Sequence, residues 1–204
     1  MRARGEHWDD AYRAKSADQQ SWFEASPDTS LALIERAAPG LSSRIVDIGG
    51  GASRLVDSLL ARGYAALTLL DVSAVALSIA RARLGDAADR VRWVQADVTS
   101  SAPAGPFDVW HDRAVFHFLT EQADRDAYVA ALERALPPGG HAIIATFAPD
   151  GPERCSGLPV CRYSAESLRD TLGGAFELLE SRRARHVTPA GREQRFVYAL
   201  FARR

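Results

Sequence analysis

An apolar run, a carboxylate and three glycines follow one another around residue 50, and this order constrains the fold more than any other feature of the sequence. Residues 45–48 hold Asp47 among apolar side chains, glycines fill 49–51, and a helical pattern begins at Ser53. Glycine permits a tight turn and a close approach of ligand to backbone, while the first free N–H groups of the next helix point into the same crevice. We therefore predict a nucleotide-cofactor site here.

The length and composition fit one globular domain. The chain has 204 residues, of which 47% are hydrophobic and 25% charged, and its formal net charge is −1. Such a chain offers no basic surface that would favour nucleic acid as a partner. The first ten residues lack the apolar core of a signal peptide, and no apolar run is long enough to span a bilayer. We expect a cytoplasmic protein that binds neither nucleic acid nor membrane, with its oligomeric state left open.

Short apolar runs alternate with amphipathic segments, which is typical of a parallel sheet whose strands are joined by helices. The predicted strands are 44–48, 66–70, 91–95, 107–111 and 141–147. The predicted helices between them are 53–62, 73–84 and 121–136. After a Pro- and Gly-rich stretch, the chain ends with a helix at 165–172 and strands at 176–182 and 194–201. Turn residues between the last two strands predict an antiparallel hairpin at the sheet edge, which gives seven strands.

Two further carboxylates stand at predicted strand ends and narrow the choice of cofactor. Asp71 follows the second strand, where a carboxylate can accept hydrogen bonds from both hydroxyls of a ribose. Asp97 follows the third strand, where a carboxylate and nearby backbone N–H groups can address the amino group and ring nitrogen of adenine. Taken alone, Asp71 is also typical of a helix cap and Asp97 of a turn. Their register with Gly49 favours ligand binding, and adenosine in particular.

Four motifs in this order resemble those of class I S-adenosylmethionine-dependent methyltransferases. They are Val46-Asp47-Ile48-Gly49-Gly50-Gly51, Asp71, Ala96-Asp97-Val98 and Phe107-Asp108-Val109-Trp110. The resemblance extends from about Ser43 to the carboxyl terminus. It implies a doubly wound, Rossmann-like α/β fold, with a seven-stranded, mostly parallel sheet, an antiparallel carboxyl-terminal hairpin strand and helices on both faces. Residues 1–42 would form an amino-terminal lid, and residues 43–204 the cofactor-binding domain.

The same resemblance implies S-adenosylmethionine as cofactor, S-adenosylhomocysteine as product, and roles for individual residues. Gly49 and Gly51 would approach the methionine part, Asp71 would hold the ribose, Asp97 would bind the adenine amine, and Val98 would pack on the ring. The predicted cofactor-binding residues are Trp22, Asp47, Gly49, Gly50, Gly51, Asp71, Val72, Asp97, Val98 and His111.

A dinucleotide cofactor fits the glycine turn less well. In a dinucleotide fold this turn faces a pyrophosphate, which the carboxylate of Asp47 would repel, and Arg54 stands where a third glycine would be expected. A sulfonium cofactor with an amino-acid head group tolerates that carboxylate. A NAD(P)-dependent oxidoreductase and a non-catalytic cofactor-binding protein are therefore the weaker alternatives.

Residues 110–119, after the fourth strand, form the best catalytic neighbourhood because they combine two histidines, an Asp–Arg pair and aromatic side chains. We predict His117 as a proton acceptor, Arg113 as a contact to an anionic substrate or a thiolate, and His111 as part of the cofactor pocket. Asp112 completes the predicted catalytic group. The alternatives are a structural ion pair between Asp112 and Arg113, and a core position for His117.

Motif content also narrows the acceptor. The Asn/Asp-Pro-Pro-Tyr tetrapeptide, which resembles the signature of methylation on bases or glutamine, is absent after the fourth strand. Asp112-Arg113-Ala114 resembles instead the Asp-Arg-Gly segment of thiol-methylating enzymes and of some seven-stranded protein-lysine methyltransferases, with Ala114 in place of glycine. We expect a small-molecule acceptor, such as a thiol or another soft nucleophile, with a protein lysine as the alternative.

The acceptor wall is expected from segments outside the glycine motif. Amino-terminal aromatics either close over the site as a lid or dock on the domain's own surface. The stretch 148–163 follows the fifth strand and could meet a small anionic or soft acceptor. The predicted substrate-binding residues are Trp8, Tyr12, Arg113, Arg154 and Cys155.

The two cysteines, Cys155 and Cys161, lie close together in the sequence. In a cytoplasmic protein a structural disulfide is disfavoured, and two thiols without a compact Cys/His set fall short of a zinc site. We therefore predict no metal site.

Overall fold

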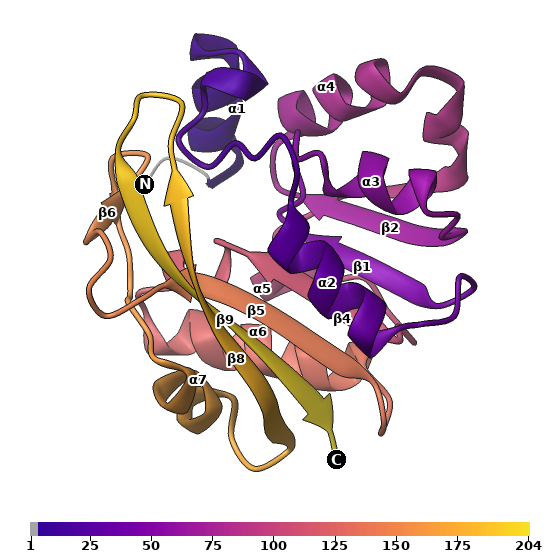
Figure 1. Ribbon diagram of the computed structural model, residues 1–204, viewed down its shortest axis with the longest axis vertical. Helices are drawn as coiled ribbons and strands as arrows, with labels where there is room; N and C mark the ends of the chain where they lie inside the picture. The colour runs from indigo at the N-terminus through magenta and orange to yellow at the C-terminus, as the bar shows by residue number, and fades with distance from the viewer. Residues whose placement is uncertain (1–3) are drawn as a thin grey trace.

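The computed structural model describes residues 4–204 as an α/β fold around one seven-stranded sheet (Figure 1). The strand order is β3-β2-β1-β4-β5-β9-β8. β1 to β5 run parallel, β9 runs antiparallel to β5, and β8 runs antiparallel to β9. Six strands of the sheet therefore point one way and β9 the other, which confirms the predicted fold class.

The strands of this sheet are β1 Arg44–Ile48, β2 Ala66–Asp71, β3 Val91–Gln95, β4 Val109–Arg113, β5 His141–Phe147, β8 Phe176–Val187 and β9 Glu193–Arg203. A separate two-stranded ribbon pairs β6 Arg154–Cys155 with β7 Leu158–Pro159. The helices are α1 Arg4–Ala14, α2 Asp28–Ala37, α3 Leu55–Ala61, α4 Ala74–Leu84, α5 Val98–Ser101, α6 Gln122–Ala135 and α7 Ala165–Leu172. Short 3-10 turns span Ala17–Gln19, Gly85–Arg90 and Phe116–Phe118.

Helices cover both faces of the sheet because neighbouring residues of each central strand are apolar and point to opposite sides. On β4, Trp110 packs in the cluster that α6 and α7 complete, whereas Val109 packs in the cluster that α2 and α3 complete. Figure 1 shows α2 and α3 in front of the sheet and α6 behind it. Burial of these apolar side chains is the main force that holds the layers together.

The predicted elements agree with the observed ones except near two ends. β4 begins at Val109 rather than at 107, because the Phe107 amide donates to the Ala135 carbonyl at the end of α6. The carboxylate of Asp108 instead accepts hydrogen bonds from the Arg44 backbone and side chain. The terminal hairpin is longer than predicted, because its strands stay paired as far as Val187 and Glu193.

The amino-terminal residues divide between two places. α1 and the segment that follows it lie over the carboxyl ends of the parallel strands, where Asp9 accepts hydrogen bonds from Ser73 Oγ and Val75 N at the start of α4. α2 instead packs against α3, β4 and β5. Residues 1–3 of the predicted lid lie outside the described part of the chain. Within 4–204, no helix is both long enough and apolar enough to cross a membrane.

Candidate active site

A cavity lies at the carboxyl ends of β1 to β4, covered by α1 and the residues just after it. It consists of two adjoining pockets that share Tyr12, Trp22, Gly49 and Arg113 in their walls. The larger pocket, next to Asp71 and Asp97, encloses about 820 Å³ including its opening to solvent. The smaller pocket lies next to Asp47 and His111. Ligand sites in α/β sheets occur at this edge of the strands.

The glycine turn leaves no space for side chains. Gly49 and Gly51 have φ values of +65° and +45°, a region that favours glycine. A Cβ on Gly49 would lie 2.1 Å from a methyl carbon of Val115, and a Cβ on Gly51 would lie 2.6 Å from the Tyr12 hydroxyl oxygen. The turn is therefore packed closely against Val115 and Tyr12, and its Gly49 lines both pockets.

Asp71 ends β2 with its carboxylate buried against the larger pocket. Its Oδ1 accepts a hydrogen bond from Ser73 N at 2.8 Å, while the cap of α4 is the Ser73 side chain, which accepts from Ala76 N. Asp71 is therefore not a helix cap. Burial, together with the nearby Asp47 carboxylate, raises the pKa of Asp71 to about 7, although backbone N–H groups oppose the shift. A ligand that donates hydrogen bonds to this buried carboxylate would stabilise its charged form.

Asp97 follows β3 and combines two roles. Its Oδ1 accepts from Thr99 N at 2.9 Å and from Thr99 Oγ1 at 2.7 Å, so it caps α5. Its Oδ2 faces the larger pocket and accepts from Arg4 Nη1 at 3.0 Å. Burial raises the pKa of Asp97, but the bonds from Thr99 and the charge of Arg4 outweigh burial and leave this pKa below its ordinary value. Capping uses one oxygen and leaves the other to the cavity.

Asp47 and His111 form the inner wall of the smaller pocket. His111 Nδ1 lies 2.7 Å from Asp47 Oδ1. The other carboxylate oxygen, Asp47 Oδ2, is buried and has no hydrogen-bond partner. A buried carboxylate oxygen without a donor is costly, so the pocket is suited to a ligand that carries a donor or a positive charge.

Aromatic side chains enclose the far end of the larger pocket. Trp8 packs edge-on against Trp22 and Phe118, with ring centroids 5.6 Å and 5.0 Å apart. Cys155, on the β6–β7 ribbon, adds a buried thiol to the same wall, and burial raises its pKa to about 11. This end of the cavity is therefore apolar and poorly hydrated.

Comparisons with known proteins agree with this geometry. A family model described as "Methyltransferase domain" matches residues 45–140. The N-methyltransferase NodS from Bradyrhizobium japonicum WM9, solved in complex with S-adenosylhomocysteine, superposes with a TM-score of 0.71 at 18% identity, over 96% of this chain and 97% of that one. Residues 45–140 are thus similar to a methyltransferase domain, and the fold of the chain is one that S-adenosylmethionine-dependent methyltransferases share. A second solved structure, from "Conversion of a Disulfide Bond into a Thioacetal Group during Echinomycin Biosynthesis", has a TM-score of 0.77 at 23% identity, over 98% of this chain and 92% of that one.

Two curated relatives match at higher identity over part of their length. Trans-aconitate 2-methyltransferase from Azoarcus sp. (strain BH72) is 33% identical over 134 residues, which are 65% of this chain and 48% of that protein. Ubiquinone biosynthesis O-methyltransferase from Pectobacterium carotovorum subsp. carotovorum (strain PC1) is 32% identical over 120 residues, 57% of this chain and 48% of that protein. The chain thus spans about half the length of the curated relatives it matches.

The structure brings most of the sequence-predicted site residues together. Ten of them line the larger pocket: Trp8, Tyr12, Trp22, Gly49, Asp71, Val72, Asp97, Val98, Arg113 and Cys155. Asp47, Gly50 and His111 line the smaller pocket. Gly51 lies beside Tyr12 and Asp71.

Three of the predicted site residues lie away from the cavity. His117 is fully buried among Phe118 and Phe147, and burial together with Arg113 lowers its pKa to about 3, so it is not positioned to accept a proton from a bound acceptor. Asp112 is fully buried and accepts hydrogen bonds from Val115 N, Phe116 N and the Tyr128 hydroxyl, which fix the turn after β4. Arg154 is exposed and bonds to the Gly157 carbonyl.

Arg113 has its charge engaged within the protein. Its Nε donates to the Tyr198 hydroxyl at 2.9 Å, its Nη1 donates to the Trp22 carbonyl at 3.0 Å, and its Nη2 lies 3.0 Å from Glu24 Oε1. The predicted ion pair with Asp112 is absent from these contacts, since the carboxylate partner of Arg113 is Glu24. The guanidinium thus holds the amino-terminal segment in place.

Sequence reasoning missed Arg4 and Ser30, which help to form the cavity or its support. Neither follows a strand-end motif. Ser30 meets His111 Nε2 at 2.9 Å only because α2 packs beside β4. A helical pattern around residue 30 would have predicted the helix, but not its neighbour.

Proposed function

We propose that the chain binds S-adenosylmethionine in this cavity and transfers its methyl group to a small-molecule acceptor, a thiol or another soft nucleophile. The observation that carries the proposal is a row of three carboxylates, Asp97, Asp71 and Asp47, at the ends of the adjacent strands β3, β2 and β1. Each has a distinct partner in the cofactor. Asp97 accepts from the adenine amine, Asp71 from the ribose hydroxyls, and Asp47 from the methionine ammonium.

The protein's own groups fit this cofactor in two ways. The glycine turn contributes Gly49 to both pockets and Gly50 to the smaller one, and neither residue has a side chain that would keep a ligand from the backbone. The unpartnered Asp47 Oδ2 gives the smaller pocket a buried negative charge, which suits a cationic head group and opposes a pyrophosphate. Both features favour a sulfonium amino-acid cofactor over a dinucleotide.

The bound cofactor supplies an already activated methyl group, so the protein's tasks are alignment and exclusion of water. Trp8, Trp22 and Phe118 form the apolar cover under which an acceptor is held. Among the described residues that line this end, the Cys155 thiol has a pKa raised by burial to about 11, and Arg113 is already engaged. The acceptor therefore has to be nucleophilic near neutral pH by itself, as a thiolate or another soft nucleophile is.

The names of the curated relatives point to small molecules, trans-aconitate in one case and an O-methylation in ubiquinone biosynthesis in the other. An oxygen acceptor is thus the competing small-molecule class. A protein lysine remains the alternative outside that class. It would call for an open groove, whereas the aromatic cover of this cavity encloses a small volume.

Incubation with methyl-labelled S-adenosylmethionine and a panel of thiols, carboxylates, phenols, amines and cell protein tests the proposal. We expect S-adenosylhomocysteine to form with a small acceptor, with thiols preferred, and Asp71→Asn to abolish turnover at the same cofactor concentration. Label found mainly on protein would contradict the small-molecule acceptor. A complete lack of turnover, including with cell extract, would contradict the catalytic function itself.

A further inference from the structure

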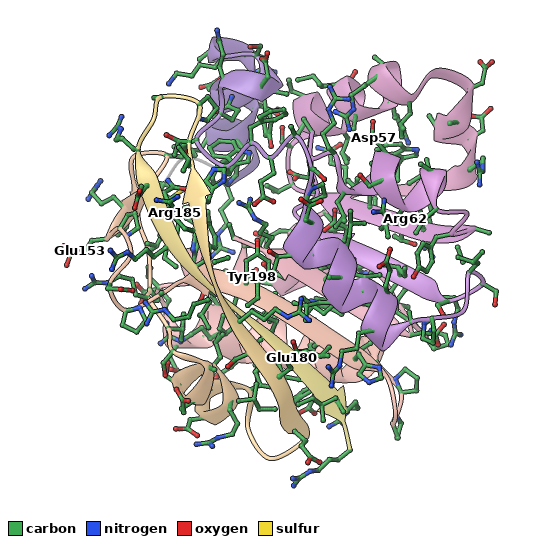
Figure 2. The ribbon with its side chains drawn as sticks, viewed as in Figure 1. Asp57, Arg62, Glu153, Glu180, Arg185 and Tyr198 are labelled. Atoms are coloured by element: carbon green, nitrogen blue, oxygen red, sulfur yellow. The ribbon has the colours of Figure 1, made fainter. Side chains whose placement is uncertain are left out.

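A buried chain of hydrogen bonds runs behind the cavity, from the amino-terminal segment to the glycine turn. Its five side chains are Arg113, Tyr198, Ser30, His111 and Asp47. They come from β4, β9, α2 and β1, and Tyr198 projects from β9 beside α2 (Figure 2). All but Arg113 are buried, and Arg113 is only 11% exposed.

Three of the four links have hydrogen-bond geometry, and the fourth joins the neighbouring hydroxyls of Tyr198 and Ser30. Arg113 Nε lies 2.9 Å from the Tyr198 hydroxyl. Ser30 Oγ lies 2.9 Å from His111 Nε2, and His111 Nδ1 lies 2.7 Å from Asp47 Oδ1.

The two ends of the chain are a donor and an acceptor. A guanidinium has only donors, and a carboxylate has only acceptors. Arg113 therefore donates to the Tyr198 hydroxyl, and His111 Nδ1 donates to Asp47. The hydroxyls of Tyr198 and Ser30, which can both donate and accept, join these two ends through His111 Nε2. One missing hydroxyl would leave the groups on both sides of it without a partner.

The ends of the chain touch two different parts of the site. At one end Arg113 holds the Trp22 carbonyl and the Glu24 carboxylate, both 3.0 Å away. At the other end His111 occupies Asp47 Oδ1, so that Asp47 Oδ2 is the oxygen left for a ligand. The first end belongs to the cover of the cavity, and the second to the methionine end of the proposed cofactor site.

We propose that Tyr198, Ser30 and His111 are positioning residues that couple closure of the segment 22–24 to the orientation of the Asp47 carboxylate. This inference rests on the proposed function. When residues 22–24 move away, Arg113 becomes a buried charge without its carbonyl and carboxylate partners. It then no longer holds the Tyr198 hydroxyl in position to bond Ser30. A cation on Asp47 Oδ2 acts in the reverse sense and favours closure, because coupling between two sites is reciprocal.

Tyr198→Phe tests the coupling, since it deletes one hydroxyl from the chain and keeps the ring. Trypsin digestion reports the cover, because Arg13 and Lys15 are exposed at the end of α1. With wild type, saturating S-adenosylhomocysteine should slow cleavage at these sites. With Tyr198→Phe, we expect affinity for S-adenosylhomocysteine to fall by about tenfold or less and, at saturation, cleavage at the rate of the ligand-free protein.

Two further variants keep the test independent of folding defects. Tyr64→Phe is the matched control, because the Tyr64 hydroxyl is also buried but donates to the Ala38 carbonyl outside the chain. It should retain wild-type protection. Ser30→Ala breaks the neighbouring link and should behave like Tyr198→Phe, and the double variant should be no worse than either single one, because a chain already broken has no further coupling to lose.

Protection of ligand-saturated Tyr198→Phe or Ser30→Ala at the wild-type level would overturn the coupling, whatever the affinity. So would wild type that binds S-adenosylhomocysteine without any slowing of cleavage. If wild type binds neither S-adenosylmethionine nor S-adenosylhomocysteine, the proposed function itself has failed, and the coupling falls with it.

Discussion

The two walls of the cavity are built differently. The sheet wall, which consists of Asp47, the glycine turn, Asp71 and Asp97, comes from three adjacent strand ends. The lid wall, which consists of Trp8, Tyr12, Trp22, Phe118 and Cys155, comes from segments far apart in the sequence. Backbone pairing positions the first wall, whereas side-chain contacts position the second. A proposed cofactor wall built by local sequence can therefore lie opposite a proposed acceptor wall that depends on tertiary packing.

The largest effect is expected for Asp71→Asn, which changes the sheet wall. Two hydrogen bonds from ribose hydroxyls to a buried carboxylate are together worth about 3 kcal/mol, so the Kd for S-adenosylhomocysteine should rise about 100-fold. Titration calorimetry measures this change. A Kd within threefold of the wild-type value would show that Asp71 does not bind the ribose.

The same substitution should stabilise the ligand-free fold at alkaline pH. Burial raises the pKa of Asp71 to about 7 in the folded protein, above its unfolded value near 3.8. Protonation therefore favours folding, and this contribution is fully present below the unfolded pKa and lost as pH rises through about 7. The Tm of Asp71→Asn minus that of wild type should grow between pH 5 and pH 8. A constant or shrinking difference would contradict the raised pKa.

The lid wall is tested by Trp8→Ala. Loss of this ring opens the aromatic cover and admits water to the acceptor end, so kcat/KM for the acceptor should fall about tenfold while the Kd for S-adenosylhomocysteine changes much less. Trp8→Phe should recover most of the loss. Equal losses in cofactor affinity and in turnover would show that the two walls are not separable in this way.

A smaller effect, of opposite sign, is expected where the walls meet. Arg4 of the lid occupies Asp97 Oδ2 and also contacts Thr99 and Asp124. Because it competes with the adenine amine for this oxygen, Arg4→Ala should tighten binding of S-adenosylhomocysteine by about twofold to fivefold, the scale of an exposed ion pair. Lys15→Ala removes one cation from the same segment and should leave the Kd unchanged. Weaker binding by Arg4→Ala would mean that Arg4 holds the cofactor instead.

The smallest effect is predicted for Arg154→Ala, because Arg154 is exposed and bonded within its own ribbon. Cofactor affinity and acceptor kcat/KM should both stay within about twofold of wild type, as expected for a surface substitution. A large loss of turnover would place the β6–β7 ribbon at the acceptor after all.

The sequence alone predicted the sheet wall well, because its signals are local. The apolar run before Gly49 and the carboxylates after β2 and β3 each follow a strand directly, so their positions follow from the alternation of strands and helices. The start of β4 was harder to predict, since it depends on Asp108 binding Arg44 rather than on apolar pattern.

The lid wall was predicted only as a set of residue types. Trp8 and Trp22 stood out as aromatics in a polar stretch, but their contact with Phe118 depends on long-range packing. His117 and Phe118 are neighbours in the sequence, yet the 3-10 turn at Phe116–Phe118 directs His117 into the core and Phe118 to the cavity. Residue type alone does not indicate which of these two neighbours enters the core and which lines the cavity.

A crystal structure of the protein with S-adenosylhomocysteine would show whether the three carboxylates hold the cofactor. We expect the ribose hydroxyls within hydrogen-bond distance of Asp71, the methionine ammonium on Asp47 Oδ2, and the adenine amine on Asp97 Oδ2 in place of Arg4. A ligand bound elsewhere, or one whose ribose makes no contact with Asp71, would contradict the proposed binding mode.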